Sequence, residues 1–285
     1  MHESQGQNLT TTDLFEEEPN KPLSGDWDHQ GIDKIYKPGE LIDIVEITPM
    51  SLGDRRTLNM LIGYAGKKIT ENIDHTIPKA MLRTPGNESN AAVTQCLDRL
   101  HTAFVKLKIK IDEKPAIRRI PLFYGSLEQV AATGQFKYRF HPALINIIRD
   151  SNQWGRLRKD VMFAFTSKYA LALYELVQKR GELKYKWEET FTIDEIRNLL
   201  GVDPKKLKRF ANLNAWALGP AVQEVNALAD YGVELLPLKR GKAVHAIKLK
   251  WWKKTSKERI EALQELQRTK LGRKARINKE TETIL

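Results

Sequence analysis

The order of sequence patterns in the second half of the chain constrains its fold more than any other feature. Helix-like segments come first, and two alternating segments, 233–238 and 243–251, follow them. Within 243–251 apolar side chains alternate with lysines, which is the period of a strand with one buried face. The tight basic turn Lys239-Arg240-Gly241-Lys242 joins the two segments into a hairpin. Three helices followed by a β-hairpin is the element order of a winged helix, which the sequence therefore predicts here.

Capping signals locate the helices of this half. Ser167 is placed to cap a helix that Gly181 ends, and Thr192 with Glu195 forms a capping box. Asp203-Pro204 fits an N-cap followed by proline at the first helical position. The predicted elements are helices over 168–180, 193–200, from 204 onward and over 214–230, with a strand over 185–191.

The first half repeats this order without any visible sequence similarity to the second. Its predicted elements are a helix from the capping pair Ser51 and Asp54, a helix from Asn87 or Ser89, strands over 105–111, 117–122 and 136–140, and a helix over 142–148. The fold class is therefore α+β, with two tandem winged-helix domains. We expect a flexible acidic tail over 1–40, domains over 41–155 and 156–254, and a charged helical C-terminal tail over 255–285.

Charge is distributed unevenly along the chain. Residues 1–40 carry a net charge of −6, which leaves +17 for the remainder of a chain whose total is +11. A body this basic attracts polyanions through counterion release and long-range steering. A nucleic acid is the partner that this charge favours, although a basic protein without such a partner has the same composition.

The sequence shows no recognisable catalytic motif. Gly63-Tyr64-Ala65-Gly66-Lys67-Lys68 lacks the glycine and the Ser or Thr that a phosphate-binding P-loop needs. The six histidines include no close pair for a metal, and we expect His101 and His245 to be structural. The single Cys96, the absence of a long apolar run and a polar N-terminus are typical of a cytoplasmic protein. We predict no cofactor, no metal and no enzymatic activity.

Basic and amide side chains mark a predicted DNA interface in the second half. Lysine and arginine hold phosphates, and asparagine hydrogen-bonds base edges, most typically adenine. The alternative is that each lysine is a solvated surface residue. Trp216 lies beside Leu213, Ala217 and Leu218, so we interpret it as a core residue, with stacking at the interface as the alternative. The candidates are Lys205, Lys206, Lys208, Arg209, Asn212 and Asn214 near the helix, and Lys239, Arg240 and Lys242 in the hairpin turn.

The first half offers a weaker set of candidates. They are polar or basic residues at the start of a predicted helix and on a predicted strand, suited to phosphate contact or to plain solvation. They are Arg83, Asn87, Ser89, Asn90 and Arg118.

Four segments carry a family resemblance. They are Phe-Thr-Ser-Lys-Tyr-Ala-Leu-Ala-Leu-Tyr-Glu-Leu at 165–176, Phe-Thr-Ile-Asp-Glu-Ile-Arg-Asn-Leu-Leu-Gly-Val at 191–202, Leu-Gly-Pro-Ala-Val-Gln-Glu-Val-Asn at 218–226 and Lys-Arg-Gly-Lys-Ala-Val at 239–244. Together they resemble the iteron-binding plasmid replication initiators of the RepA/RepE/π type, over roughly 45–252. Family members often place arginines just before Leu-x-Pro-Ala, where this chain has Asn214, Ala215 and Trp216. Lys242 also replaces the arginine of the family's hairpin, which keeps the charge but not the bidentate geometry.

The resemblance implies that two winged-helix domains grip a directly repeated site at a plasmid origin. It also implies monomers that initiate, dimers that repress, origin opening and recruitment of the host initiator and the replicative helicase. Two alternatives stay open at this point. One is a transcriptional regulator on the same fold; the other is a DNA-nicking rolling-circle initiator, which the missing His-x-His pair disfavours.

Both ends of the chain invite a functional and a plain interpretation. Asp13-Leu14-Phe15 resembles the end of a sliding-clamp-binding motif, although an acidic tail without a partner is the favoured interpretation. The capping pair Thr255 and Glu258 opens a charged helix to about Leu271, followed by basic residues. We favour a solvated helix with a frayed basic tail over a specific DNA arm.

Overall fold

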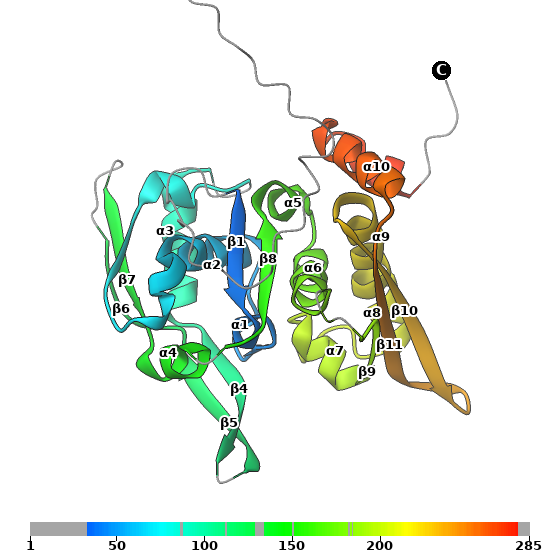
Figure 1. Ribbon diagram of the computed structural model, residues 1–285, viewed down its shortest axis with the longest axis horizontal. Helices are drawn as coiled ribbons and strands as arrows, with labels where there is room; N and C mark the ends of the chain where they lie inside the picture. The colour runs from blue at the N-terminus through cyan, green and yellow to red at the C-terminus, as the bar shows by residue number, and fades with distance from the viewer. Residues whose placement is uncertain are drawn as a thin grey trace, which may run out of the picture.

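Two α+β halves lie side by side in the protein, with the first half on the left in Figure 1 and the second on the right. The computed structural model describes residues 33–85, 88–111, 113–128, 134–149, 151–181, 183 and 185–278. A continuous cluster of buried apolar side chains runs through both halves. None of the helices within these ranges is long and apolar enough to cross a membrane.

The second half has the winged-helix plan that the sequence predicts. Its strands form one antiparallel sheet in the order β10-β11-β9, and Leu249 and Trp251 are buried on its inner face. The expected caps are present: Ser167 accepts from the Tyr169 N–H, and Thr192 forms a capping box with Glu195. The elements are α6 (Lys168–Arg180), β9 (Glu188–Thr192), α7 (Ile193–Leu199), α8 (Phe210–Leu213), η4 (Asn214–Leu218), α9 (Gly219–Leu228), β10 (Tyr231–Arg240) and β11 (Ala243–Lys253).

The predicted helix after Asp203-Pro204 is wrong. This segment is a turn. The Asp203 carboxylate accepts from the Lys205 N–H, and the Asp203 backbone carbonyl accepts from the Lys206 N–H. Leu207 then adopts a left-handed φ of 52°, which no helix continues through. The next helix begins at Phe210 rather than Asn214. It runs to Leu228 through the π-helical stretch η4, and we call α8, η4 and α9 together the recognition helix.

The first half contains two antiparallel sheets where the sequence predicts one. Their orders are β2-β4-β5 and β3-β7-β6. Strand β6 was not expected, because a register shift between Phe123 and Gly125 interrupts its alternation. The predicted cap Ser51 is present, and of the two possible helix starts Asn87 and Ser89, Ser89 is the N-cap of α3. The elements are α1 (Gly39–Ile42), β2 (Val45–Glu46), α2 (Leu52–Ala65), η2 (Gly66–Thr70), β3 (His75–Pro78), η3 (Lys79–Leu82), α3 (Asn90–His101), β4 (Phe104–Ile111), β5 (Lys114–Pro121), β6 (Phe123–Glu128), β7 (Gln135–Phe140) and α4 (Pro142–Arg149).

A two-stranded sheet lies between the halves. Strand β1 (Lys34–Pro38) pairs antiparallel with β8 (Trp154–Arg158), and α5 (Lys159–Ala164) leads on to α6. Both strands were missed, because residues 34–38 fall in the expected flexible tail and 154–158 at the expected boundary between the domains. Each is short and carries polar residues, and its partner lies more than a hundred residues away in the chain, beyond the reach of local patterns.

A buried polar network joins this sheet to helices of both halves. The Lys37 ammonium lies 2.9 Å from the Glu175 carboxylate and donates to the Asn59 side chain at 3.0 Å. The Asn59 amide donates to the other Glu175 oxygen at 2.6 Å, and Arg55 pairs with Glu46 at 2.6 Å. Burial lowers the pKa of Lys37, and the Glu175 carboxylate opposes that shift. The network holds β1, α2 and α6 in one arrangement, because each buried charge needs its partner.

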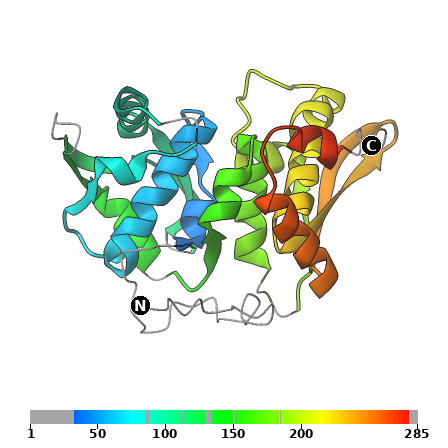
Figure 2. The same ribbon diagram turned by 90° about the horizontal axis from the view of Figure 1, so that it is seen from above.

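The C-terminal segment packs against the second half, as Figure 2 shows. It comprises α10 (Ser256–Gln267), with the predicted Thr255–Glu258 capping box, and α11 (Arg273–Ile277). The buried Arg273 side chain donates to the carbonyls of Ala164 and Leu266, and Arg276 pairs with Glu265 at 2.8 Å. The expected frayed tail is therefore wrong for residues 272–278, because internal carbonyls and one carboxylate accept these arginine bonds. The helix also ends at Gln267 rather than at Leu271.

Candidate nucleic-acid interface

Arg197 of α7 organises the basic turn before the recognition helix. Its buried guanidinium donates to three backbone carbonyls, those of Leu207 at 2.5 Å, Lys206 at 2.7 Å and Asp203 at 3.2 Å. A planar group with five donors suits such convergent bonding. The turn is thereby fixed with its basic side chains outward. Those side chains, all exposed, are Lys205, Lys206, Lys208 and Arg209.

The recognition helix presents its first two turns to solvent. Leu213 and Ala217 are buried against the core, whereas Asn212 and Asn214 are exposed as a base-reading role requires. Trp216 is 71% exposed, so its interpretation as a core residue is wrong. Leu213, Ala217 and Leu218 already occupy the core-facing positions. The indole is left on the outer surface of the π-helical stretch.

The β10–β11 hairpin extends from the body as the wing of the second domain (Figure 1). Arg240 pairs with Ala243, so Gly241 and Lys242 form the turn itself. Gly241 has a φ of +64°, a conformation that favours glycine. Lys239, Arg240 and Lys242 are exposed at this tip. The hairpin therefore lies where the sequence predicts it. The contact of these three side chains with DNA stays a prediction.

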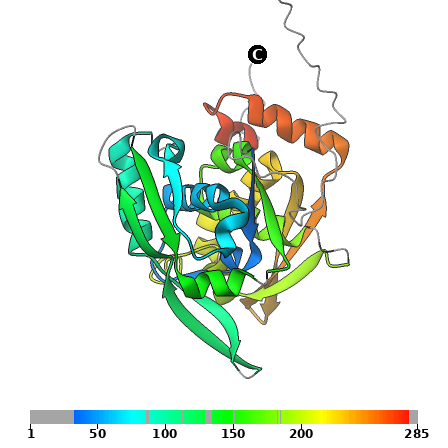
Figure 3. The same ribbon diagram turned by 60° about the vertical axis from the view of Figure 1, so that its left-hand side comes forward.

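The first-half candidates separate into two places. Arg83 donates to the Asn90 side chain at 2.8 Å, and the Ser89 hydroxyl accepts the Ala92 N–H as an N-cap. Arg118 lies on exposed β5, in the β4–β5 hairpin that extends below the body, away from α10 (Figures 1 and 3). Together with burial, its charge lowers the pKa of His141 at the start of α4. Asn87 lies outside the described residues.

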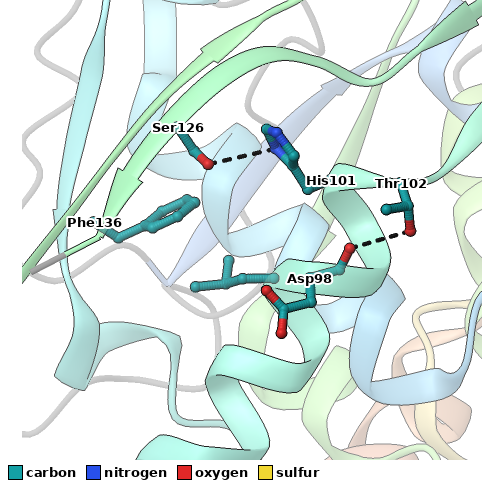
Figure 4. Close-up of a pocket in the computed structure, with 6 residues that line it drawn as sticks. Asp98, His101, Thr102, Ser126 and Phe136 are labelled. Carbon is teal, nitrogen blue, oxygen red and sulfur yellow. Dashed lines mark hydrogen bonds between the residues drawn. The ribbon is translucent and has the colours of Figure 1, made fainter. Parts of the chain in front are cut away.

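A small pocket of about 200 Å³ lies between α3 and the β6–β7 hairpin (Figure 4). The His101 Nδ1 atom lies 3.4 Å from the Ser126 hydroxyl, while the Asp98 carboxylate points away from the imidazole. A serine nucleophile needs a histidine that a third group orients, and Asp98 does not supply that geometry. Within the described ranges no three His, Cys, Asp or Glu side chains cluster as a metal site would require.

At this interface, sequence reasoning missed two features, the role of Arg197 and the exposure of Trp216. An arginine on the helix before a basic turn is a weak signal, because it equally suits a solvated helix face. The exposure of Trp216 depends on how the helix packs, which the local apolar pattern misrepresents.

Two family models match this architecture. The first, described as initiator replication protein WH1, matches residues 34–178, and the second, initiator Rep protein WH2, matches residues 192–251. The chain belongs to the initiator Rep protein family. Its two winged-helix domains are those of the family, and the first model includes α6, which the sequence analysis assigned to the second domain.

One solved structure agrees with this assignment at the level of the fold. The crystal structure of the Pi initiator protein in complex with iteron DNA matches with a TM-score of 0.54 at 14% identity, covering 78% of this chain and 98% of that one. Domains 2 and 3 of RctB match with a TM-score of 0.43 at 10% identity, covering 71% of this chain and 82% of that one. The comparison with curated proteins found no match.

Proposed function

We propose that this initiator Rep protein binds direct repeats in double-stranded DNA at a plasmid origin, and that it promotes origin opening and helicase loading there. The observation that carries the proposal is the exposed start of the recognition helix behind a fixed basic turn. Family membership and the likeness to an initiator solved with iteron DNA support it.

The residues of the second domain divide into two roles. Lys205, Lys206, Lys208 and Arg209 hold phosphates at the entry of the helix into the major groove, and Asn212 and Asn214 reach base edges. The wing residues Lys239, Arg240 and Lys242 contact the backbone or an adjacent groove. This arrangement has the recognition helix entering with its N-terminal turn leading.

The first domain adds backbone contacts through Arg83, Ser89, Asn90 and Arg118, with Asn87 beside them in the chain. Two domains on one face of the duplex suit repeats of about 20 base pairs, roughly two helical turns. The protein acts without a cofactor or catalytic step of its own. Its further partners are a second copy of the chain, the host initiator and the helicase. A sliding clamp at Asp13, Leu14 and Phe15, which lie outside the described residues, is the weakest of these proposals.

A footprint of the protein on its plasmid's origin tests the proposal. We expect protection of the repeats that survives excess random DNA, and loss of protection in a variant with Lys208→Ala and Arg209→Ala. Lys257→Ala on α10 is the control, since it removes one exposed charge far from the wing tip (Figure 1). Equal protection of repeats and random DNA would overturn the proposal.

Two further assays separate the alternatives. A transcriptional regulator binds its site but does not support origin-dependent plasmid maintenance, whereas an initiator does both. A nicking initiator relaxes supercoiled origin DNA in the presence of Mg²⁺, and we expect this protein to leave that DNA intact.

A further inference from the structure

The outer surface at the start of the recognition helix is uncharged. All residues from Phe210 to Leu218 lack a formal charge, although the segments before them and the wing are strongly basic. Those exposed in this stretch are two alanines, two asparagines and one tryptophan: Ala211, Asn212, Asn214, Ala215 and Trp216. The surface is therefore built for contact with neutral groups, flanked by residues suited to phosphates.

Helical spacing determines how these five side chains are arranged around the recognition helix. Leu213 and Ala217 face the core, so Ala211 and Ala215 lie opposite them, at the centre of the outer surface. Asn212 and Trp216, four residues apart, share one flank, and Asn214 occupies the other. The small alanines let the helix approach base edges closely, with longer side chains reaching out on both sides.

We propose that this surface reads A·T base pairs, with the asparagines on adenine and Trp216 on thymine methyl groups; the inference rests on the proposed DNA-binding function. Asparagine matches the N6 donor and N7 acceptor of adenine. The guanine edge presents two acceptors, and its usual partners, arginine and lysine, are absent from residues 210–218. The basic residues before the helix hold phosphates, which carry no sequence information.

The exposure of Trp216 is the second, independent support. A tryptophan that is 71% exposed leaves a large apolar surface in water, at a position that the proposed function places against DNA. The major-groove edges of the bases present hydrogen-bonding groups and one apolar group, the thymine C5-methyl. An indole there is thus complementary to thymine, and contact with Ala211 or Ala215 extends the same preference.

A selection from random 25-base-pair duplexes tests the proposal with the full-length chain. We expect the wild-type protein to enrich sites with A·T pairs in one half, and Trp216→Ala to lose thymine at one or two positions while keeping the others. Because Trp216 is exposed, this variant retains its fold, which thermal unfolding checks, and Trp216→Phe restores part of the preference. Lys257→Ala serves as the control and selects the wild-type site.

Deoxyuridine then isolates the methyl group. Replacing thymidine by deoxyuridine at the affected positions of the selected duplex weakens wild-type binding about fourfold for each buried methyl. The same replacement leaves Trp216→Ala binding unchanged. Enrichment of a site whose second-domain half is G·C-rich, or equal loss in both proteins on deoxyuridine, overturns the inference. No enrichment of any sequence by the wild-type protein overturns the proposed function itself.

Discussion

The two winged-helix domains share an order of elements but differ in how they present their candidate helices. In the second domain the recognition helix starts behind exposed lysines, and its outer residues point to solvent. In the first, the start of α3 is occupied by internal bonds: Ser89 caps the helix and Arg83 donates to Asn90. The two domains therefore differ in how many polar side chains they leave available for DNA at the start of this helix. We expect the second domain to make most of the contacts that distinguish one DNA sequence from another.

The largest expected effect concerns the buried network around Glu175, whose residues all lie in the part of the chain that the first family model matches. Glu175→Ala removes the carboxylate that Lys37, Asn59 and Arg55 share, and leaves a buried cation without its main partner. We expect a loss of about 3–5 kcal/mol in the free energy of unfolding, measured by urea denaturation. The exposed pair between Glu188 and Lys248 supplies the control, because Glu188→Ala should change stability by less than about 1 kcal/mol. Equal losses in both variants would mean that the network stabilises the fold no more than an exposed ion pair does.

Acid should weaken the first domain before the second. Burial lowers the pKa of His75 to about 4, although neighbouring Asp74 opposes the shift, and the ring packs against Tyr138 and Phe140. A lowered folded-state pKa means that the unfolded chain binds the proton more tightly. The stability from this group is fully present above pH 6.5 and falls by about 3 kcal/mol as the pH drops toward 4.

Unfolding curves between pH 7 and pH 4 measure this dependence. In His75→Gln, the free energy of unfolding should fall less steeply with decreasing pH, because the contribution of His75 is gone. His245 in the second domain is exposed, so His245→Gln should keep the wild-type slope. A wild-type slope in His75→Gln would show that other groups cause the acid sensitivity.

The DNA affinities of two matched double variants compare the domains directly. Lys208→Ala with Arg209→Ala should weaken binding to the repeat about 10- to 100-fold and lower the salt-dependence slope by about 2. Arg83→Ala with Arg118→Ala removes the same charge from the first domain and should cost less than tenfold. Fluorescence anisotropy at several salt concentrations gives both quantities. A larger loss in the first-domain variant would reverse the proposed division of labour.

The smallest expected effect concerns helix caps. Thr192 forms a capping box with Glu195, whereas the Ser89 side chain caps α3 through the Ala92 N–H. Replacing either by alanine should cost roughly 1 kcal/mol, with the greater loss at Thr192, because its hydroxyl accepts the Glu195 N–H and also donates to the Glu195 carboxylate. Thermal unfolding ranks the two variants. A greater loss at Ser89 would show that the first domain depends more on its helix start than the structure indicates.

The sequence by itself determined the elements whose signals are local. The capping residues Ser51, Ser167, Thr192 and Thr255 all cap helices as predicted, because a cap acts within three residues of its position. The wing turn and the alternation around Trp251 are equally local, and the family motifs lie in the same second half.

Only the tertiary structure decided what depends on residues far apart. Strands β1 and β8 pair across the chain, and the network around Glu175 exists only when β1, α2 and α6 meet. Arg197 turns the predicted helix after Asp203 into a fixed turn by binding its carbonyls. Trp216 lies outside because Leu213 and Ala217 already occupy the core-facing positions. Local patterns specify which side chains are apolar or charged, whereas the packing of distant segments selects which of them reach the surface and the DNA.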